Sequence, residues 1–179
     1  MSVGRLRGGE LLAGVGAVVL LVSLFLDWFD VPPSAVEAQI RRTGVDQIDV
    51  SLPRDVWAAS GWDALGWPVL AVAAAAIALG VWLVFATATV RPVTQVVAAD
   101  VLTASVAPIA LLTLLLRALV FQPGPNELTT VRYGAWIGLA GAAALTVGAW
   151  WSLADERTDA PESAYVPPAP RPAPPTHSS

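Results

Sequence analysis

The decisive stretch of this chain runs from Pro68 to Val90 and reads PVLAVAAAAIALGVWLVFATATV, without one charged side chain. A helix that crosses a bilayer needs roughly 20 predominantly apolar residues, and this stretch is long enough. It has no polar stripe at helical spacing, which is typical of a helix in lipid or in the interior of a large soluble protein. A chain of 179 residues has too little other material to bury several such helices, so lipid is the expected surrounding.

Three further stretches have the same character. In addition to the span at 67–90, we expect spans at about residues 10–29, 100–121 and 133–154. The span at 100–121 is interrupted only by Arg117. The sequence therefore predicts an all-α membrane protein, a four-helix transmembrane bundle that occupies residues 10–154.

The composition excludes several classes of function. Charged residues make up 13% of the chain, against about 25% in soluble domains. Cys and Lys are absent and His177 is the only histidine, so we expect no metal site, no cofactor and no catalytic residues. Nucleic-acid binding needs a basic face, whereas this chain has a net charge of −4. The sequence indicates a protein that is not an enzyme.

Three segments lie outside the expected spans. Residues 1–9 carry Arg5 and Arg7, which favour a cytoplasmic N-terminus, although arginines in the loops make the count nearly even. Residues 30–66 form an extracytoplasmic loop that we expect to be structured. Residues 155–179 are rich in proline and predict a disordered cytoplasmic tail.

The loop carries local signals of structure. Ser34 with Glu37, and Ser60 with Asp63, have the spacing of a capping box at the start of a helix. The segment 45–52 could form a short extended piece. These patterns favour a compact loop that lies over the helix ends.

Aromatic residues gather at the expected span ends, where tryptophan favours the membrane–water interface. We expect two interface belts. One consists of Trp28, Trp62, Trp67, Tyr133 and Trp136. The other consists of Trp82, Trp150 and Trp151.

Arg117 is the most informative single residue. An ionised Arg at the bilayer centre costs about 2.5–3.5 kcal/mol on insertion scales, so it usually faces protein, pairs with an acid or extends to the interface. Asp27 and Arg132 are expected at the same membrane level. The three could form a small polar or ligand site beneath the loop. The alternative is a salt bridge that clamps helices together, or an Arg117 side chain that reaches the interface.

Other polar or irregular positions have two interpretations each. Glu10 and Asp100 stand at expected helix starts, where the helix dipole favours an acid, although a proton relay is the alternative for Asp100. Pro108 is either a tolerated kink or the mark of a broken, ligand-binding helix. Gly134 and Gly138 form a pair of small residues that predicts close helix packing.

Several short motifs resemble an uncharacterised group of small four-span membrane proteins of actinobacteria and related bacteria. The motifs are LFLDWF at 24–29, SGWDAL at 60–65 and RYGAWIG at 132–138. The resemblance covers roughly residues 8–157 and implies the four-span fold and a bacterial plasma-membrane location. Members of the group often have Pro where this chain has Asp27. The resemblance implies no activity.

Three functions remain open on these grounds. The first is a scaffold or accessory subunit of a cell-envelope complex, with the outer loop as the contact surface for a membrane or envelope protein. The second is a small transporter or channel subunit with a polar site near Arg117. The third is a protein that binds or senses anionic lipid through Arg117 and Arg132.

Overall fold

Four long helices lie side by side in the computed structural model, which describes residues 8–32, 34, 41–42, 58–89, 93–123 and 129–158. The long helices are α1 (Gly8–Ser23), α4 (Trp67–Ala88), α5 (Val93–Leu119) and α6 (Tyr133–Thr158). A single turn of helix, α3, spans Gly61–Ala64. Three segments are long and apolar enough to cross a membrane: Trp67–Ala88, Val96–Leu119 and Tyr133–Ala154. The helix α1 is also apolar but shorter.

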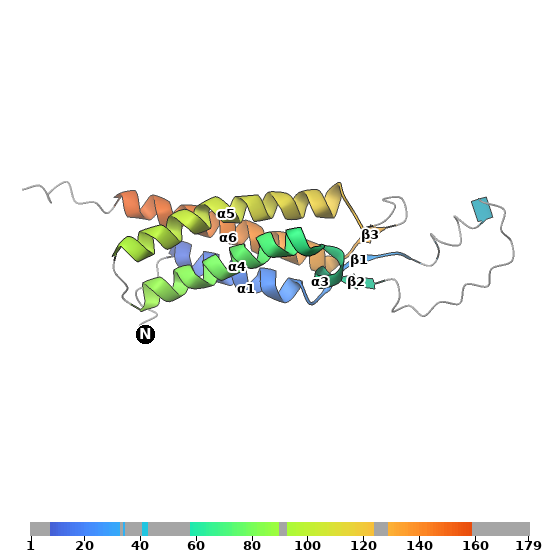
Figure 1. Cartoon of the computed structure of the whole chain (residues 1–179), viewed down its shortest axis with the longest axis horizontal. Coiled ribbons are helices and arrows are strands. Elements are labelled where there is room, and N and C mark those ends of the chain that lie inside the picture. The colour runs from blue at the N-terminus through green and yellow to red at the C-terminus, as the bar shows by residue number, and fades with distance from the viewer. Residues whose placement is uncertain are drawn as a thin grey trace, which may run out of the picture.

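The four long helices form a ring in which each one packs against two neighbours. Helix α1 contacts α4 and α6, and α5 also contacts α4 and α6. Helices α4 and α6 run in the same direction, from the end with the strands to the far end, while α1 and α5 run in the opposite direction (Figure 1).

Helices α1 and α6 approach so closely that glycine is required at their contact. A Cβ atom on Gly148 would lie 2.3 Å from the Ala13 nitrogen, and one on Gly141 would lie 2.7 Å from the Leu20 nitrogen. From the other side, a Cβ atom on Gly16 would lie 2.4 Å from the Leu145 nitrogen. The small residues recur every seven positions, the spacing that keeps one face of a helix turned to a supercoiling partner.

The interior of the bundle is built from small and aliphatic side chains. At the middle of the bundle, a Cβ atom on Gly80 of α4 would lie 2.7 Å from Leu145 Cδ1 and 3.0 Å from Ala17 Cβ. Three helices are therefore in van der Waals contact at this level. Ala76, Ala107 and other buried alanines extend this packing along the axis.

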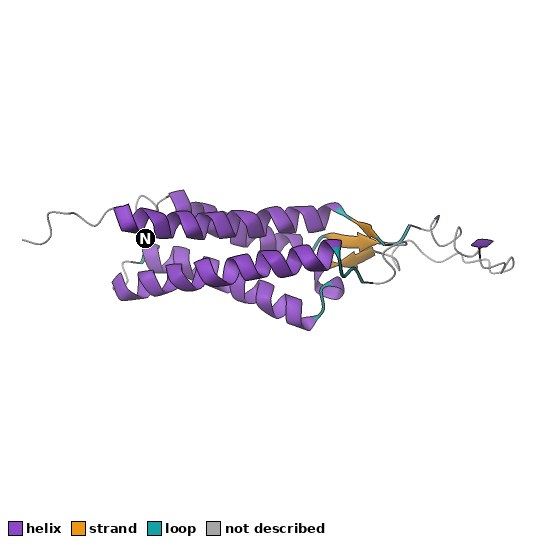
Figure 2. Ribbon diagram, turned by 90° about the horizontal axis from the view of Figure 1, so that it is seen from above, coloured by secondary structure: helices purple, strands orange, loops and turns teal. Residues whose placement is uncertain are grey.

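A three-stranded antiparallel sheet closes one end of the bundle (Figure 2). Its strands are β1 (Asp27–Asp30), β2 (Ala58–Ser60) and β3 (Thr130–Val131), in the order β2-β1-β3. Phe29 pairs with Ala59 on one side and with Val131 on the other. The sheet therefore joins the segment that follows α1 to the segments that precede α3 and α6.

The first helix is shorter than the expected span at 10–29, because α1 ends at Ser23. Leu24, Phe25 and Leu26 make tight bonds to carbonyls three residues back, and the chain then enters β1. The Trp28 indole N–H donates to the Ser23 carbonyl at 2.7 Å, so this carbonyl at the helix end accepts from both Trp28 and Leu26. Apolar composition alone could not distinguish this helix end from a continuing helix.

The other helix bounds also differ in part from the sequence-based bounds. Helix α5 begins at Val93, well before the expected start at residue 100, and α6 continues past Ala154 to Thr158. Residues 159–179, and the segment 45–52, lie outside the described residues, as does Glu37 of the first expected capping box.

The helix start predicted at Ser60 is confirmed, and Pro68 lies in the first turn of α4. Ser60 is the N-cap of α3: its Oγ accepts from the Asp63 N–H at 3.4 Å and donates to Asp63 Oδ2 at 2.7 Å.

Candidate functional site

The sheet end of the bundle holds all three residues of the expected polar site, and its centre is Trp28. The Trp28 side chain is fully buried, in a slot between α3 and α6. A Cβ atom on Gly138 would lie 2.4 Å from Trp28 Cζ2, and one on Gly61 would lie 2.8 Å from Trp28 Nε1. Trp28 therefore packs inside the protein, and the prediction that it belongs to an interface belt is wrong.

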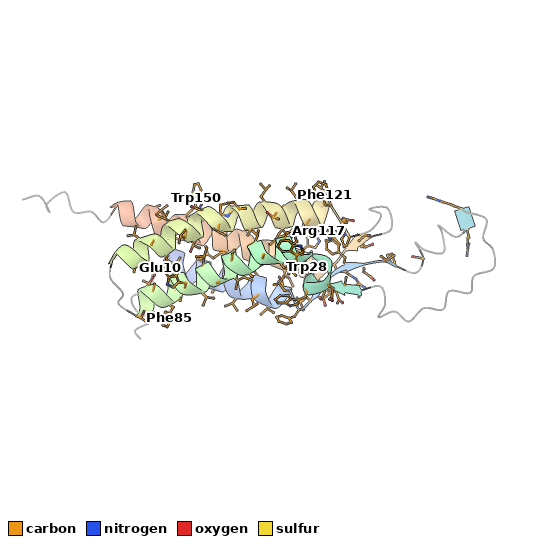
Figure 3. The ribbon with its side chains drawn as sticks, in the orientation of Figure 1. Glu10, Trp28, Phe85, Arg117, Phe121 and Trp150 are labelled. Carbon is orange, nitrogen blue, oxygen red and sulfur yellow. The ribbon has the colours of Figure 1, made fainter. Side chains whose placement is uncertain are left out.

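Arg117 ties α5 to α3. One guanidinium nitrogen donates to the Ala64 carbonyl at 2.6 Å and the other to the Phe121 carbonyl at 2.6 Å. Ala64 is the last residue of α3, and Phe121 follows the end of α5, so both acceptors lie at helix C-terminal ends. Such ends carry partial negative charge, which stabilises a nearby cation. Arg117 and Trp28 both lie toward this end of the bundle (Figure 3).

Arg132 makes an ion pair with an acid other than the expected one. Its guanidinium lies 2.6 Å from the Asp30 carboxylate, and the two side chains are 47% and 17% exposed. The Arg132 backbone N–H also donates to the Trp28 carbonyl at 2.8 Å. This residue joins the start of α6 to both ends of β1.

The structure gives the three expected residues separate surroundings. Among the described hydrogen bonds and ion pairs, none joins the side chains of Asp27, Arg117 and Arg132 to one another. Asp27 pairs with Ser60 in the sheet, and its carbonyl oxygen lies against Gly134. The two arginines hold helices and strands in place: Arg117 donates to backbone carbonyls, and Arg132 pairs with Asp30.

Gly134 and Gly138 do permit close packing against α6, mainly of β1 and, at Gly138, also of Ser23 at the end of α1. A Cβ atom on Gly134 would lie 2.5 Å from the Asp27 carbonyl oxygen, and Gly138 faces Trp28. The close contact between the backbones of α1 and α6 is made at Gly141 and Gly148, further along α6. The sequence singled out the first two because of their spacing of four, which does not reveal what lies opposite.

The remaining members of the two expected belts have exposed side chains. At the sheet end, Trp67 is 80% exposed, and Trp62, Trp136 and Tyr133 are exposed as well. The Trp62 ring makes an edge contact with Phe25, with ring centroids 5.6 Å apart. Trp82, Trp150 and Trp151 are exposed on the bundle surface too.

The far end of the bundle holds a buried polar group, of which the sequence analysis singled out Glu10 and Asp100 but predicted neither the burial nor the grouping. Its members are Glu10, Asp100, Thr103 and Ser152, all less than 5% exposed. The packing places them near one another along the axis: Gly9 abuts Ser152, and Val101 lines one crevice with Leu153 and Ala154. Glu10 and Asp100 stand out in the sequence as acids in apolar stretches, but only the packing shows that both are buried.

The helix-dipole explanation of Asp100 does not hold, because α5 begins at Val93 and its first turn carries no acid. Asp100 lies two turns inside the helix and is fully buried. Glu10 does lie in the first turn of α1, as expected, but it is buried as well. The described residues contain no group of three or more His, Cys, Asp or Glu that could hold a metal ion.

Pro108 is accommodated inside a continuous α5. Proline has no N–H, so the Ala104 carbonyl, four residues earlier, loses its helical donor. The Trp150 indole N–H of α6 donates to that carbonyl at 3.0 Å. A neighbouring helix thus satisfies the acceptor that proline leaves open, as membrane helices require.

Comparison of the chain with protein families, with curated proteins and with solved structures found no match. The resemblance to the four-span group therefore remains an expectation. The function has to be inferred from the geometry of the described residues.

Proposed function

We propose that this chain is a non-enzymatic, four-span protein of the bacterial plasma membrane that serves as a scaffold or accessory subunit of a cell-envelope complex. In this proposal the bundle is the anchor, and residues 31–57 are the contact surface. The pairing of Asp30 with Ala58 carries the proposal, because it holds both ends of that segment side by side on the sheet.

The sheet is a rigid base for such a segment. Trp28 fixes β1 in a slot of the bundle, the Arg132–Asp30 ion pair joins β1 to the start of α6, and Arg117 holds α3, which follows β2. Each strand that borders the segment is therefore bound to the helices. In this proposal the sheet holds the two ends of residues 31–57 at a fixed place on the bundle, and the bundle interior takes no part in binding the partner.

Four crossings are part of the proposal, although α1 is short. Its 16 residues extend about 24 Å at 1.5 Å per residue, against a hydrocarbon layer of about 30 Å. The apolar sequence continues through Leu24–Leu26, where each backbone N–H donates to a carbonyl three residues back, so the irregular backbone leaves none of these donors open to lipid. Leu24 is buried, and the Phe25 side chain is exposed. With four crossings, both termini lie on the cytoplasmic side.

The two rival functions have less support. A transporter or channel needs a path through the middle of the bundle, where Ala17, Gly80 and Leu145 are in contact. The buried Glu10 and Asp100 are the one observation in its favour, because buried acids in membrane helices often mark ion pathways. An anionic lipid head group would have to compete for the donors of Arg117 and Arg132 with carbonyls and Asp30.

The proposal is tested by replacing residues 31–57 with a short Gly-Ser linker that leaves β1 and β2 intact. We expect the full chain, extracted with a mild detergent, to recover one membrane or envelope protein in constant ratio. The linker variant should lose that protein at unchanged thermal stability. A control variant that ends at residue 158 should retain it. Recovery without the segment, or a folded full chain that never carries a partner, would contradict the proposal.

A further inference from the structure

Helix α4 carries two exposed tryptophans, one at its first residue and one toward its other end. Trp67, at the sheet end, is 80% exposed, and Trp82, toward the far end, is 38% exposed. They are fifteen positions apart, which corresponds to about 23 Å along the helix axis. Tryptophan at the surface of a membrane helix is enriched at the interface, where its ring contacts the acyl boundary and its N–H contacts head groups.

The same spacing recurs on α6, which runs in the same direction as α4. Trp136 is 56% exposed and Trp151 is 53% exposed, again fifteen positions or about 23 Å apart. Trp150 is not a marker of this kind, because its N–H donates to the Ala104 carbonyl. Figure 3 places Phe85 at the far end of the bundle and Phe121 at the sheet end, where they add exposed rings to the two belts.

The other two helices give similar lengths by independent measures. Helix α1 has 16 residues, or about 24 Å. On α5, Asp100 and Arg117 enclose an uncharged stretch of about 26 Å. The two tryptophan pairs thus agree with each other and fall short of the roughly 30 Å of a typical hydrocarbon layer. The helical part of α1 and the uncharged stretch of α5 have similar lengths, but Leu24–Leu26 extend the apolar run of α1, and Asp100 is buried in protein.

The helices themselves do not impose this short length. The apolar segments of α4, α5 and α6 have 22 to 24 residues, enough for an ordinary bilayer. In a bilayer of ordinary thickness, however, the four tryptophan rings would be drawn into hydrocarbon, where an indole N–H without an acceptor is costly. The aromatic belts therefore favour a thinner layer than the apolar segments alone require.

We propose that the surface of this bundle is matched to a thin bilayer, with a hydrocarbon layer of about 24 Å, so that the protein thins the membrane around it or works where the membrane is thin. The partner of the belt surface is the lipid itself, with short acyl chains. The proposal rests on the proposed membrane insertion and adds the thickness that the bundle requires.

The experiment reconstitutes the full chain into vesicles of phosphatidylcholines whose two monounsaturated chains run from fourteen to twenty-two carbons. We expect the thermal unfolding temperature to be highest with chains of fourteen or sixteen carbons and to fall steadily as the chains lengthen. A maximum at eighteen carbons or longer would overturn the proposal.

Two double variants connect that maximum to the belts. Replacing Trp82 and Trp151 by leucine should move the maximum toward longer chains, because the far belt is gone. The control replaces Val81, the neighbour of Trp82, and Val147 by leucine; both are exposed but carry no indole, so the maximum should stay unchanged. If the belt variant keeps the same maximum as the control, the tryptophans do not set the thickness and the proposal is wrong.

A single cysteine separates this proposal from the proposed insertion, since the natural chain has none. Ala74 lies in the middle of α4 on its exposed face. In Ala74→Cys, a membrane-impermeant maleimide should not label the thiol in any of the vesicles. Labelling there would contradict insertion, and the thickness proposal with it. Protection together with a maximum at long chains would overturn the thickness proposal alone.

Discussion

Arg117 lies in an apolar helix near the sheet end, and its two bonded nitrogens reach neutral carbonyls. Both acceptors, Ala64 and Phe121, stand at helix C-terminal ends, where the backbone leaves carbonyls without donors. The charge thus compensates two partial charges of the backbone. Its Nε atom is buried and has no hydrogen-bond partner among the described residues. The residue behaves as a structural tie between α3 and α5.

Replacing Arg117 by methionine should lower the free energy of unfolding by about 3 kcal/mol, since two bonds to a charged donor are lost and two carbonyls remain without it. Unfolding in detergent, followed by circular dichroism, measures the change. Arg132→Gln is the control, because its ion pair with Asp30 is half exposed and should contribute less than about 1 kcal/mol. Equal losses in the two variants would argue against the tie.

Trp28 depends on a glycine opposite its ring. A methyl group in Gly138→Ala would approach Trp28 Cζ2 to 2.4 Å and Ser23 Oγ to 2.7 Å, so the ring must move. We expect a loss of about 1–3 kcal/mol, the usual cost of overpacking. Gly8→Ala is the matched control, since its nearest neighbour would be the Trp151 ring at 3.9 Å. Thermal melts of both variants test this: a Gly138→Ala melt as high as that of Gly8→Ala would show that the slot can adjust.

At the scale of the element, α5 is a continuous helix with a proline inside it. Its continuity depends on α6, because the Trp150 N–H replaces the donor that Pro108 lacks. The contact also gives one indole of the bundle surface a protein partner. A proline in a membrane helix therefore has a structural explanation here, and the alternative of a broken, ligand-binding helix has no geometric support at this position.

A double-mutant cycle tests this explanation. Trp150→Phe should destabilise the protein by about 1 kcal/mol, because the Ala104 carbonyl loses its donor. In a Pro108→Ala background the same change should cost clearly less, since residue 108 then supplies a backbone N–H to Ala104. Additive effects of the two substitutions in thermal or denaturant unfolding would contradict the compensation.

At the scale of the whole molecule, the ring of four helices decides how many times the chain crosses the membrane. Three helices are long and apolar enough by themselves, and α1 packs along α6 through glycines at 9, 16, 141 and 148. Since α1 lies against α6 over most of its length, insertion of α6 should bring α1 into the membrane as well. Four crossings place the two termini on one side, whereas three place them on opposite sides.

Two single-cysteine variants decide between these numbers. In Ser2→Cys and Ser178→Cys, an impermeant maleimide added to intact cells should label neither thiol, and both should react after the cells are opened. Ser51→Cys should react in intact cells, because residue 51 belongs to the segment that we propose to lie outside. Labelling of one terminus but not the other would mean an odd number of crossings.

The sequence by itself determined the features that depend on composition and near neighbours. Long apolar stretches predicted α4, α5 and α6, and Ser60 with Asp63 predicted a helix start that the structure confirms. These features depend on interactions between residues that are close together in the chain, so the local sequence pattern is enough to predict them.

Only the tertiary structure decided where each of these residues points and what it meets. The buried Trp28, the ion pair of Arg132 with Asp30 instead of Asp27, the carbonyl acceptors of Arg117 and the burial of Asp100 all depend on elements far away in the chain. A helix that is apolar on every side has no preferred face, so its sequence does not indicate which side meets protein and which meets lipid. That choice is made by the fit of glycines against neighbouring backbones, which exists only once the helices are packed.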